Sequence, residues 1–289
     1  MALIRYRPCA PLDRYVECFW WSQRDRAEVF GEHMLPSGSV QMIFALHDAP
    51  ILCMPGSLCG EPLVWSGGIV HGPQWTYYKS GPKPAGATFG VSFHPGAAGN
   101  VLGVPVTELT DRHVPADALW GSRASELRER LLAAQGPSAA FRVMEAALMS
   151  VRLHRPLLMH PAVAQALECR TSGWGSSRVA EIQRRAGYSP RHFIALFRAA
   201  VGLTPKHYYR VKRFATALQG LAGSKGGGLA DLAASVGYSD QAHMTREFRE
   251  FSGVTPTQYR PRDPTSILHH QTHDTFSGMS LGNKSSRPA

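Results

Sequence analysis

Two segments near the end of the chain repeat each other, and this repeat constrains the fold more than any other feature of the sequence. The first segment begins at Val179 and reads VAEIQRRAGYSPRHFIALFRAAVGLTPKHYYR; the second begins at Leu229 and reads LADLAASVGYSDQAHMTREFREFSGVTPTQYR. A shift of 50 positions aligns the Gly-Tyr-Ser motif, and a shift of 51 aligns Phe-Arg and Gly-x-Thr-Pro. Repetition of this kind indicates a duplicated supersecondary unit.

Each copy has the pattern of two short helices joined by a tight turn. In the first copy Gly187 ends one helix, Ser189 caps the next, and Pro190 occupies its first position. In the second copy Gly237 and Ser239 take the roles of stop and cap. This arrangement is typical of the helix-turn-helix of DNA-binding proteins, whose second helix enters the major groove. A plain helical hairpin is the alternative, and the duplication in a basic segment argues against it.

The positive charge of the chain is confined to the half that carries the repeat. Residues 1–150 contain 12 Lys and Arg against 13 Asp and Glu, whereas residues 151–289 contain 19 against 8, which accounts for the net charge of +10. An uneven distribution of this kind is expected for a phosphate-binding domain attached to a neutral one. A solvated basic face is the alternative, but the charge coincides with the repeat.

The repeat also resembles a known family. The tandem pair, the helix that joins the copies and the endings GLTPKHYYR and GVTPTQYR resemble the C-terminal DNA-binding domain of AraC/XylS-type transcription regulators, over roughly residues 160–262. The resemblance implies two helix-turn-helix units joined by one long helix, with recognition helices in successive major grooves of double-stranded DNA. Promoter or operator DNA is then the expected partner, and RNA polymerase is a candidate partner.

The N-terminal half reads as β-rich. Runs of aromatic and β-branched residues separated by Gly and Pro clusters suggest a small barrel or sandwich. The predicted strands are Tyr15–Trp21, Ser39–Leu46, Ile51–Met54, Gly68–His71, Trp75–Lys79 and Ala87–His94. The phrases LPSGSVQMIF and GVSFHPGAAGNVLGVPVTELTD resemble a variant sensor domain of the same regulators. That resemblance implies a cupin-like barrel that senses an unknown small-molecule effector.

Two amphipathic helices are predicted after the barrel, at Ser125–Ala134 and Ser138–His154. The resemblance implies that they pack beside the barrel and build a homodimer contact, and intramolecular packing alone is the alternative. We therefore expect an α+β protein of two domains. A β-rich cupin-like barrel with flanking helices spans residues 1–155, an all-α tandem helix-turn-helix domain spans residues 160–262, and a polar, disordered tail spans residues 263–289.

The predicted recognition helices are Pro190–Ala200 and Asp240–Phe251. In the first, the family pattern assigns three positions to the groove; in the second, four residues lie opposite the apolar Met244 and Phe248. The predicted base-reading residues are Arg191, Ile194, Ala195, Gln241, His243, Thr245 and Arg246. Ser177, Arg178, Arg198, Lys206 and Arg249 are predicted to contact phosphates, which position a protein without carrying sequence information.

The two copies differ in what they can read. Arginine pairs with guanine and glutamine with adenine, so Arg191, Gln241 and Arg246 can discriminate bases. Ile194 and Ala195 can only touch a thymine methyl group. Sparse base reading is therefore expected of the first copy.

Several other functions are not supported by the sequence. The five cysteines have no CxxC spacing, which favours neither disulfides nor a zinc site and fits a reducing cytoplasm. Neither a signal peptide nor a transmembrane stretch of about 20 apolar residues is apparent, so a cytoplasmic location is expected. The cysteines are Cys9, Cys18, Cys53, Cys59 and Cys169.

An enzyme that uses the same domain to reach DNA is the main rival hypothesis. A metal-dependent barrel would need converging ligands, and the candidates His33, His47, His71 and His94 form no HxH motif. A DNA-repair enzyme would need clustered cysteines or a Pro-Cys-His nucleophile, which the sequence lacks. We therefore expect no catalytic step, no metal and no cofactor. A general nucleic-acid binder without an effector is the third reading.

Overall fold

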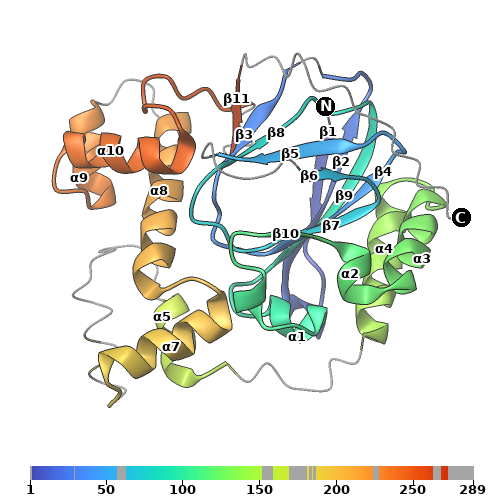
Figure 1. Ribbon diagram of the computed structural model, residues 1–289, viewed down its shortest axis with the longest axis horizontal. Helices are drawn as coiled ribbons and strands as arrows, with labels where there is room; N and C mark the ends of the chain where they lie inside the picture. The colour runs from blue at the N-terminus through green and yellow to red at the C-terminus, as the bar shows by residue number, and fades with distance from the viewer. Residues whose placement is uncertain are drawn as a thin grey trace, which may run out of the picture.

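The protein consists of a two-sheet domain and a helical domain that lie side by side (Figure 1). The computed structural model describes residues 2–28, 30–56, 63–151, 159–168, 181, 184, 187–223, 228–262 and 268–272. We call the described part of residues 2–151 the β domain and that of residues 159–262 the helical domain. Most of the predicted interdomain boundary, Leu153–His160, falls outside the described residues.

The first sheet of the β domain has six antiparallel strands in the order β1-β2-β9-β4-β7-β10. Their bounds are Ala2–Tyr6 (β1), Val16–Arg24 (β2), Gly86–Phe93 (β9), Gln41–Leu46 (β4), Gly68–His71 (β7) and His113–Pro115 (β10). Strands β4 and β9 lie in the middle and are buried along almost their whole length, as expected for strands covered on both faces.

The second sheet has the order β11-β3-β8-β5-β6. Its strands are His269–Gln271 (β11), Glu32–Met34 (β3), Tyr78–Ser80 (β8), Ile51–Pro55 (β5) and Leu63–Trp65 (β6). The described strands thus form two separate sheets, so the predicted barrel is not closed. Strand β11 also corrects the prediction of a disordered tail, because residues 268–272 are ordered and β11 pairs with β3.

Helices cover the outer face of the first sheet. They are α1 (Ala98–Leu102), α2 (Ala116–Trp120), α3 (Ser122–Leu132) and α4 (Pro137–Ser150). Phe141 of α4 stacks on Tyr6 at 5.2 Å between ring centroids and packs against Phe89 at 5.8 Å. Leu127 and Leu131 lie four residues apart on α3 and are buried in the same core. The intramolecular packing predicted for these two helices is therefore present.

The helical domain is built around α8, Pro205–Gly223, with a helix-turn-helix unit at either end (Figure 1). Helix α5 (Pro161–Glu168) precedes the first unit and packs against its recognition helix, α7 (Pro190–Val201). The helices of the second unit are α9 (Leu229–Val236) and α10 (Gln241–Ser252). The first helix predicted for copy one lies mostly outside the described residues. No described helix is long and apolar enough to cross a membrane.

The caps explain where the recognition helices α7 and α10 begin. The Ser189 hydroxyl accepts a hydrogen bond from the His192 amide at 3.3 Å, as predicted. In the second unit the cap is Asp240, whose carboxylate accepts from the His243 amide at 2.6 Å. The prediction of Ser239 as the cap is therefore wrong by one residue, because the aspartate carboxylate forms the stronger, charge-assisted bond.

Candidate nucleic-acid interface and ligand cavity

Helix α7 presents the three side chains predicted for it to solvent. Arg191, Ile194 and Ala195 are exposed, and Ile194 retains 43% of its accessible surface. Residues spaced by three and four positions share one helix face, which explains why all three lie together. The opposite face is fixed by Phe193 and Phe197, which are fully buried in the core of the first unit. One long polar side chain and two apolar ones are therefore available here.

Helix α10 presents its polar residues unequally. Gln241 and Arg246 are exposed, whereas His243 and Thr245 are half-buried. The His243 ring lies within hydrogen-bond distance of the Ser239 hydroxyl, at 3.0 Å, and packs edge-on against Tyr238. The Thr245 hydroxyl donates to the Gln241 carbonyl at 2.9 Å. Gln241 and Arg246 are therefore the more accessible of the four predicted base-reading residues of this helix, a difference that the outward-face prediction did not distinguish.

Three of the predicted phosphate contacts can be placed. Arg198 and Arg249 occupy equivalent positions in the last turns of α7 and α10, and both are exposed. Lys206 is exposed in the first turn of α8. Ser177 and Arg178 lie outside the described residues. Cations thus lie near both units, where they can approach the backbone of a bound duplex.

Two other arginines of α8 have a structural role that sequence reasoning missed. The Arg210 Nε donates to the Glu247 carboxylate at 2.7 Å, and Arg213 donates to both oxygens of the same group at 2.7–2.9 Å. Glu247 is only 3% exposed. Arg213 also lies over the Tyr238 ring at 4.3 Å. These side chains fix α10 on α8 and are not part of a surface for phosphates.

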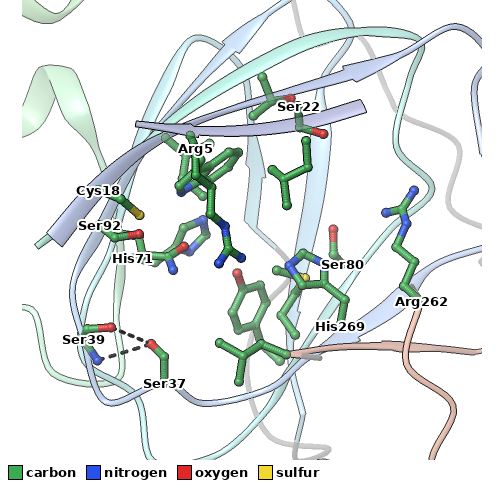
Figure 2. Close-up of a pocket in the computed structure, with 18 of the residues that line it drawn as sticks. Arg5, Cys18, Ser22, Ser37, Ser39, His71, Ser80, Ser92, Arg262 and His269 are labelled. Atoms are coloured by element: carbon green, nitrogen blue, oxygen red, sulfur yellow. Dashed lines mark hydrogen bonds between the residues drawn. The ribbon is translucent and has the colours of Figure 1, made fainter. Parts of the chain in front are cut away.

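A cavity of about 820 Å³ lies between the two sheets and is bordered by α8 (Figure 2). Five cationic side chains line it: Arg5, Arg24, Lys83, Lys212 and Arg262. Glu17 is the one carboxylate among the described lining residues. Figure 2 shows the Arg5 guanidinium directed toward the middle of the cavity. The cavity therefore has the size of a small-molecule site and a positive lining.

Three of these cations pair with carboxylates that do not themselves line the cavity. The buried Glu32 carboxylate pairs with Lys83, with Arg262 at 3.3 Å, and with His269 at 2.9 Å. Arg24 pairs with Glu28 at 3.1 Å, and Arg262 also reaches Glu28. Two carboxylates thus face Arg24, Lys83 and Arg262, and burial holds the pKa of Lys83 well below its usual range.

Helix α8 contributes Lys212 to the cavity wall. Its ammonium group donates to the Ser37 carbonyl at 3.1 Å and lies over the Tyr208 ring at 5.3 Å. Burial lowers the pKa of this lysine. Because α8 also carries both helix-turn-helix units, a ligand in the cavity can touch the helix that joins them.

The inner wall is aromatic and sulfur-containing. Trp20, Trp65 and Tyr78 line it, and the Trp65 indole N–H donates to the Cys53 sulfur at 3.3 Å. Burial raises the pKa of the Cys53 thiol to about 12, so it is no nucleophile at neutral pH. The Ser22 hydroxyl is buried and has no hydrogen-bond partner in the described part of the chain. Such a group is available to a ligand.

His71 lines the cavity and is paired with His113 of the neighbouring strand β10. His71 stacks on Tyr78 at 5.3 Å, and its Nδ1 lies 2.5 Å from Nδ1 of His113. Burial lowers the pKa of His113 to about 4 and holds that of His71 well below its usual range. Both rings are therefore neutral at pH 7, and one donates to the other. Among the described residues no group of three or more His, Cys, Asp or Glu side chains could hold a metal ion.

Comparison with known proteins finds a matching family model for each part of the chain. A family model described as "Helix-turn-helix domain" matches residues 182–262, and one described as "Domain of unknown function (DUF6597)" matches residues 4–115. The probable transcription factor PqrA of Proteus vulgaris is 31% identical over 92 residues, which cover 32% of this chain and 75% of PqrA. The chain belongs to the AraC/XylS-type transcription regulators.

Other relatives match over smaller shares. The probable transcriptional regulator LumQ of Photobacterium leiognathi is 34% identical over 82 residues, which are 28% of this chain and 33% of LumQ. The chain thus spans only a third of the length of that relative. Unsaturated-fatty-acid-bound ToxT of Vibrio cholerae superimposes with a TM-score of 0.44 at 8% identity, covering 82% of this chain and 93% of ToxT.

Proposed function

We propose that this AraC/XylS-type protein binds specific DNA sequences and regulates transcription from them. The observation that carries the proposal is the pair of recognition helices, α7 and α10, at opposite ends of α8. Each turns its apolar face inward and exposes side chains on the other face. At 1.5 Å per residue, the 19 residues of α8 span about 28 Å, which is close to the roughly 34 Å of one helical turn of DNA.

Base reading should depend most on the second unit. Arg246→Ala and Gln241→Ala are each expected to cost about 1–3 kcal/mol at one base pair, because a bidentate contact is lost. Arg249→Ala should weaken all sequences alike, since phosphates carry no base information. Competition binding with specific and random duplexes distinguishes the two effects. An equal loss on both duplexes for Arg246→Ala would remove this residue from the base-reading set.

The binding site should be asymmetric. The second unit offers Gln241 and Arg246, whereas the first offers Arg191 beside two apolar residues. We expect selection from random DNA to yield one strongly specified half-site and one in which Arg191 fixes only one or two base pairs. Attaching a cleavage reagent to one unit would assign each half-site. Equal information in both halves would contradict this prediction.

We further propose that a small organic acid bound in the cavity controls DNA binding. The positive lining favours an anion, and the aromatic inner wall and Ser22 suit a ligand with an apolar body and a polar group. Lys212 joins this site to α8, so an anion that binds it changes the contact between α8 and the Ser37 carbonyl. An effector with different affinities for the two arrangements shifts the balance between them. A second copy of the chain and RNA polymerase remain predicted partners.

Lys212 supplies the test of the effector site. A panel of aromatic and aliphatic carboxylates and their neutral amides should be screened by thermal unfolding of the full chain. We expect carboxylates alone to raise the unfolding temperature. Lys212→Gln should weaken their binding about 10- to 150-fold, the loss of one charge-assisted hydrogen bond. Lys206→Gln, on the exposed side of the same helix, should leave ligand affinity unchanged. Preferential binding of the amides would refute the acid hypothesis.

A further inference from the structure

The two helix-turn-helix units present equivalent corners to the β domain. Gly202 and Gly253 are 51 positions apart and end α7 and α10 in the left-handed conformation, with φ of +85° and +77°. A Cβ atom at Gly202 would lie 2.5 Å from the Pro73 ring and 3.0 Å from the Thr110 hydroxyl. A Cβ atom at Gly253 would lie 2.7 Å from the phenol end of Tyr77. Both corners therefore pack closely against one loop, residues 72–77.

The middle of this loop joins the two units as well. Trp75 stacks on His207 of α8 at 5.1 Å, with the rings within 9° of parallel. It also packs against the apolar cores of both units, one of which contains Phe197 and the other Phe214. Loop 72–77 is thus in contact with the first unit, the second unit and the helix between them.

Hydrogen bonds hold the two corners in place. The Thr110 hydroxyl donates to the Gly202 carbonyl at 2.9 Å. His33 Nδ1 lies 2.8 Å from the Ser252 carbonyl, to which it donates, and the His33 ring stacks on Tyr77 at 4.5 Å. A backbone carbonyl at the end of each recognition helix is therefore hydrogen-bonded to the β domain.

The loop also begins and ends at the cavity. It follows His71 and precedes Tyr78, and these two rings line the cavity and stack on each other. We propose that loop 72–77 is a clamp that fixes the separation of the two recognition helices and so selects the spacing of the half-sites. The proposal rests on the DNA-binding function proposed above. Because loop 72–77 begins and ends at the cavity wall, a ligand bound in the cavity can contact the residues that flank the clamp.

The chain offers a matched control for the clamp. Gly237 also ends a helix in the left-handed conformation, with φ of +88°, but a Cβ atom there would meet nothing described within 4 Å. Alanine at Gly237 and at Gly253 therefore carries similar backbone strain. Only Gly253→Ala also displaces Tyr77. The difference between the two variants isolates the contact with the loop.

The test measures the affinity of full-length protein for duplexes with the two selected half-sites at different spacings. The affinity of the wild type is expected to fall about 100-fold when the spacer changes by half a helical turn, because one unit can no longer bind its half-site. Gly253→Ala and Tyr77→Ala should reduce this loss to less than about 10-fold, and Gly237→Ala should behave as the wild type. The double variant Gly253→Ala/Tyr77→Ala should show the same loss of affinity on changed spacing as Tyr77→Ala, within about 2-fold. Without the Tyr77 ring, the alanine at position 253 no longer clashes with the loop.

The possible outcomes distinguish failure of the clamp from failure of the proposed DNA-binding function. An unchanged spacing preference in Gly253→Ala and Tyr77→Ala overturns the clamp and leaves DNA recognition intact. A wild type without sequence-specific binding overturns the proposed function, and the clamp with it. If Tyr77→Ala fails to fold, the comparison of Gly253→Ala with Gly237→Ala still shows whether the contact with loop 72–77 sets the half-site spacing.

Discussion

DNA affinity is expected to fall about 150-fold when the salt concentration rises from about 50 to 200 mM. Four cationic side chains are predicted to contact phosphates: Arg178, Arg198, Lys206 and Arg249. Each neutralised phosphate releases condensed counterions, and four of them give a slope of about −3.6 in a plot of log affinity against log salt. Titration of a labelled duplex with the full chain at several salt concentrations measures this slope.

A single substitution tests the origin of the salt dependence. Lys206→Gln should make the slope shallower by about 0.9, the contribution of one phosphate. Arg123→Gln, an exposed change on α3 of the β domain, should leave the slope unaltered. An affinity that does not respond to salt would contradict a phosphate-binding role for the basic half of the chain.

Local signals in the sequence were enough to predict the described helices of the repeat, α7, α9 and α10. The predicted stop at Gly237 is confirmed, since α9 ends at Val236 and Gly237 follows in the left-handed conformation. Ser189 and Pro190 mark the start of α7. The groove-facing sets followed from helical spacing, although their contact with bases remains a prediction. What spacing could not reveal is that Ser239 would engage the His243 ring.

Features formed by distant segments could not be predicted in this way. Strand β11 has three residues without apolar alternation, and its order comes from pairing with β3 and from the hydrogen bond of His269 with Glu32. The cavity has the same origin. Lys212 meets the Ser37 carbonyl 175 positions away, and no short motif records such a contact. The strand pattern predicted either a small barrel or a sandwich, and the resemblance favoured a cupin-like barrel; the pattern itself does not show whether the sheets close.

Removal of one buried charge is expected to cause the largest loss of stability in the helical domain. Glu247→Gln should lower the free energy of unfolding by about 3–5 kcal/mol, because Arg210 and Arg213 then lose their shared counter-ion in a partly buried site. Glu250 provides the matched control, since it pairs with Arg210 but is 40% exposed. Glu250→Gln should cost less than about 1 kcal/mol.

Glu247→Gln should also weaken DNA binding by the second unit more than binding by the first. Glu247 lies on α10, and its partners lie on α8, so their ion pairs orient the second unit alone. Denaturant titration of the full chain gives the stability change, and footprinting at low denaturant shows which half-site is lost first. We expect protection to disappear under the second unit while the half-site under α7 stays protected. Equal destabilisation by Glu247→Gln and Glu250→Gln would mean that the buried network contributes no more than a surface ion pair.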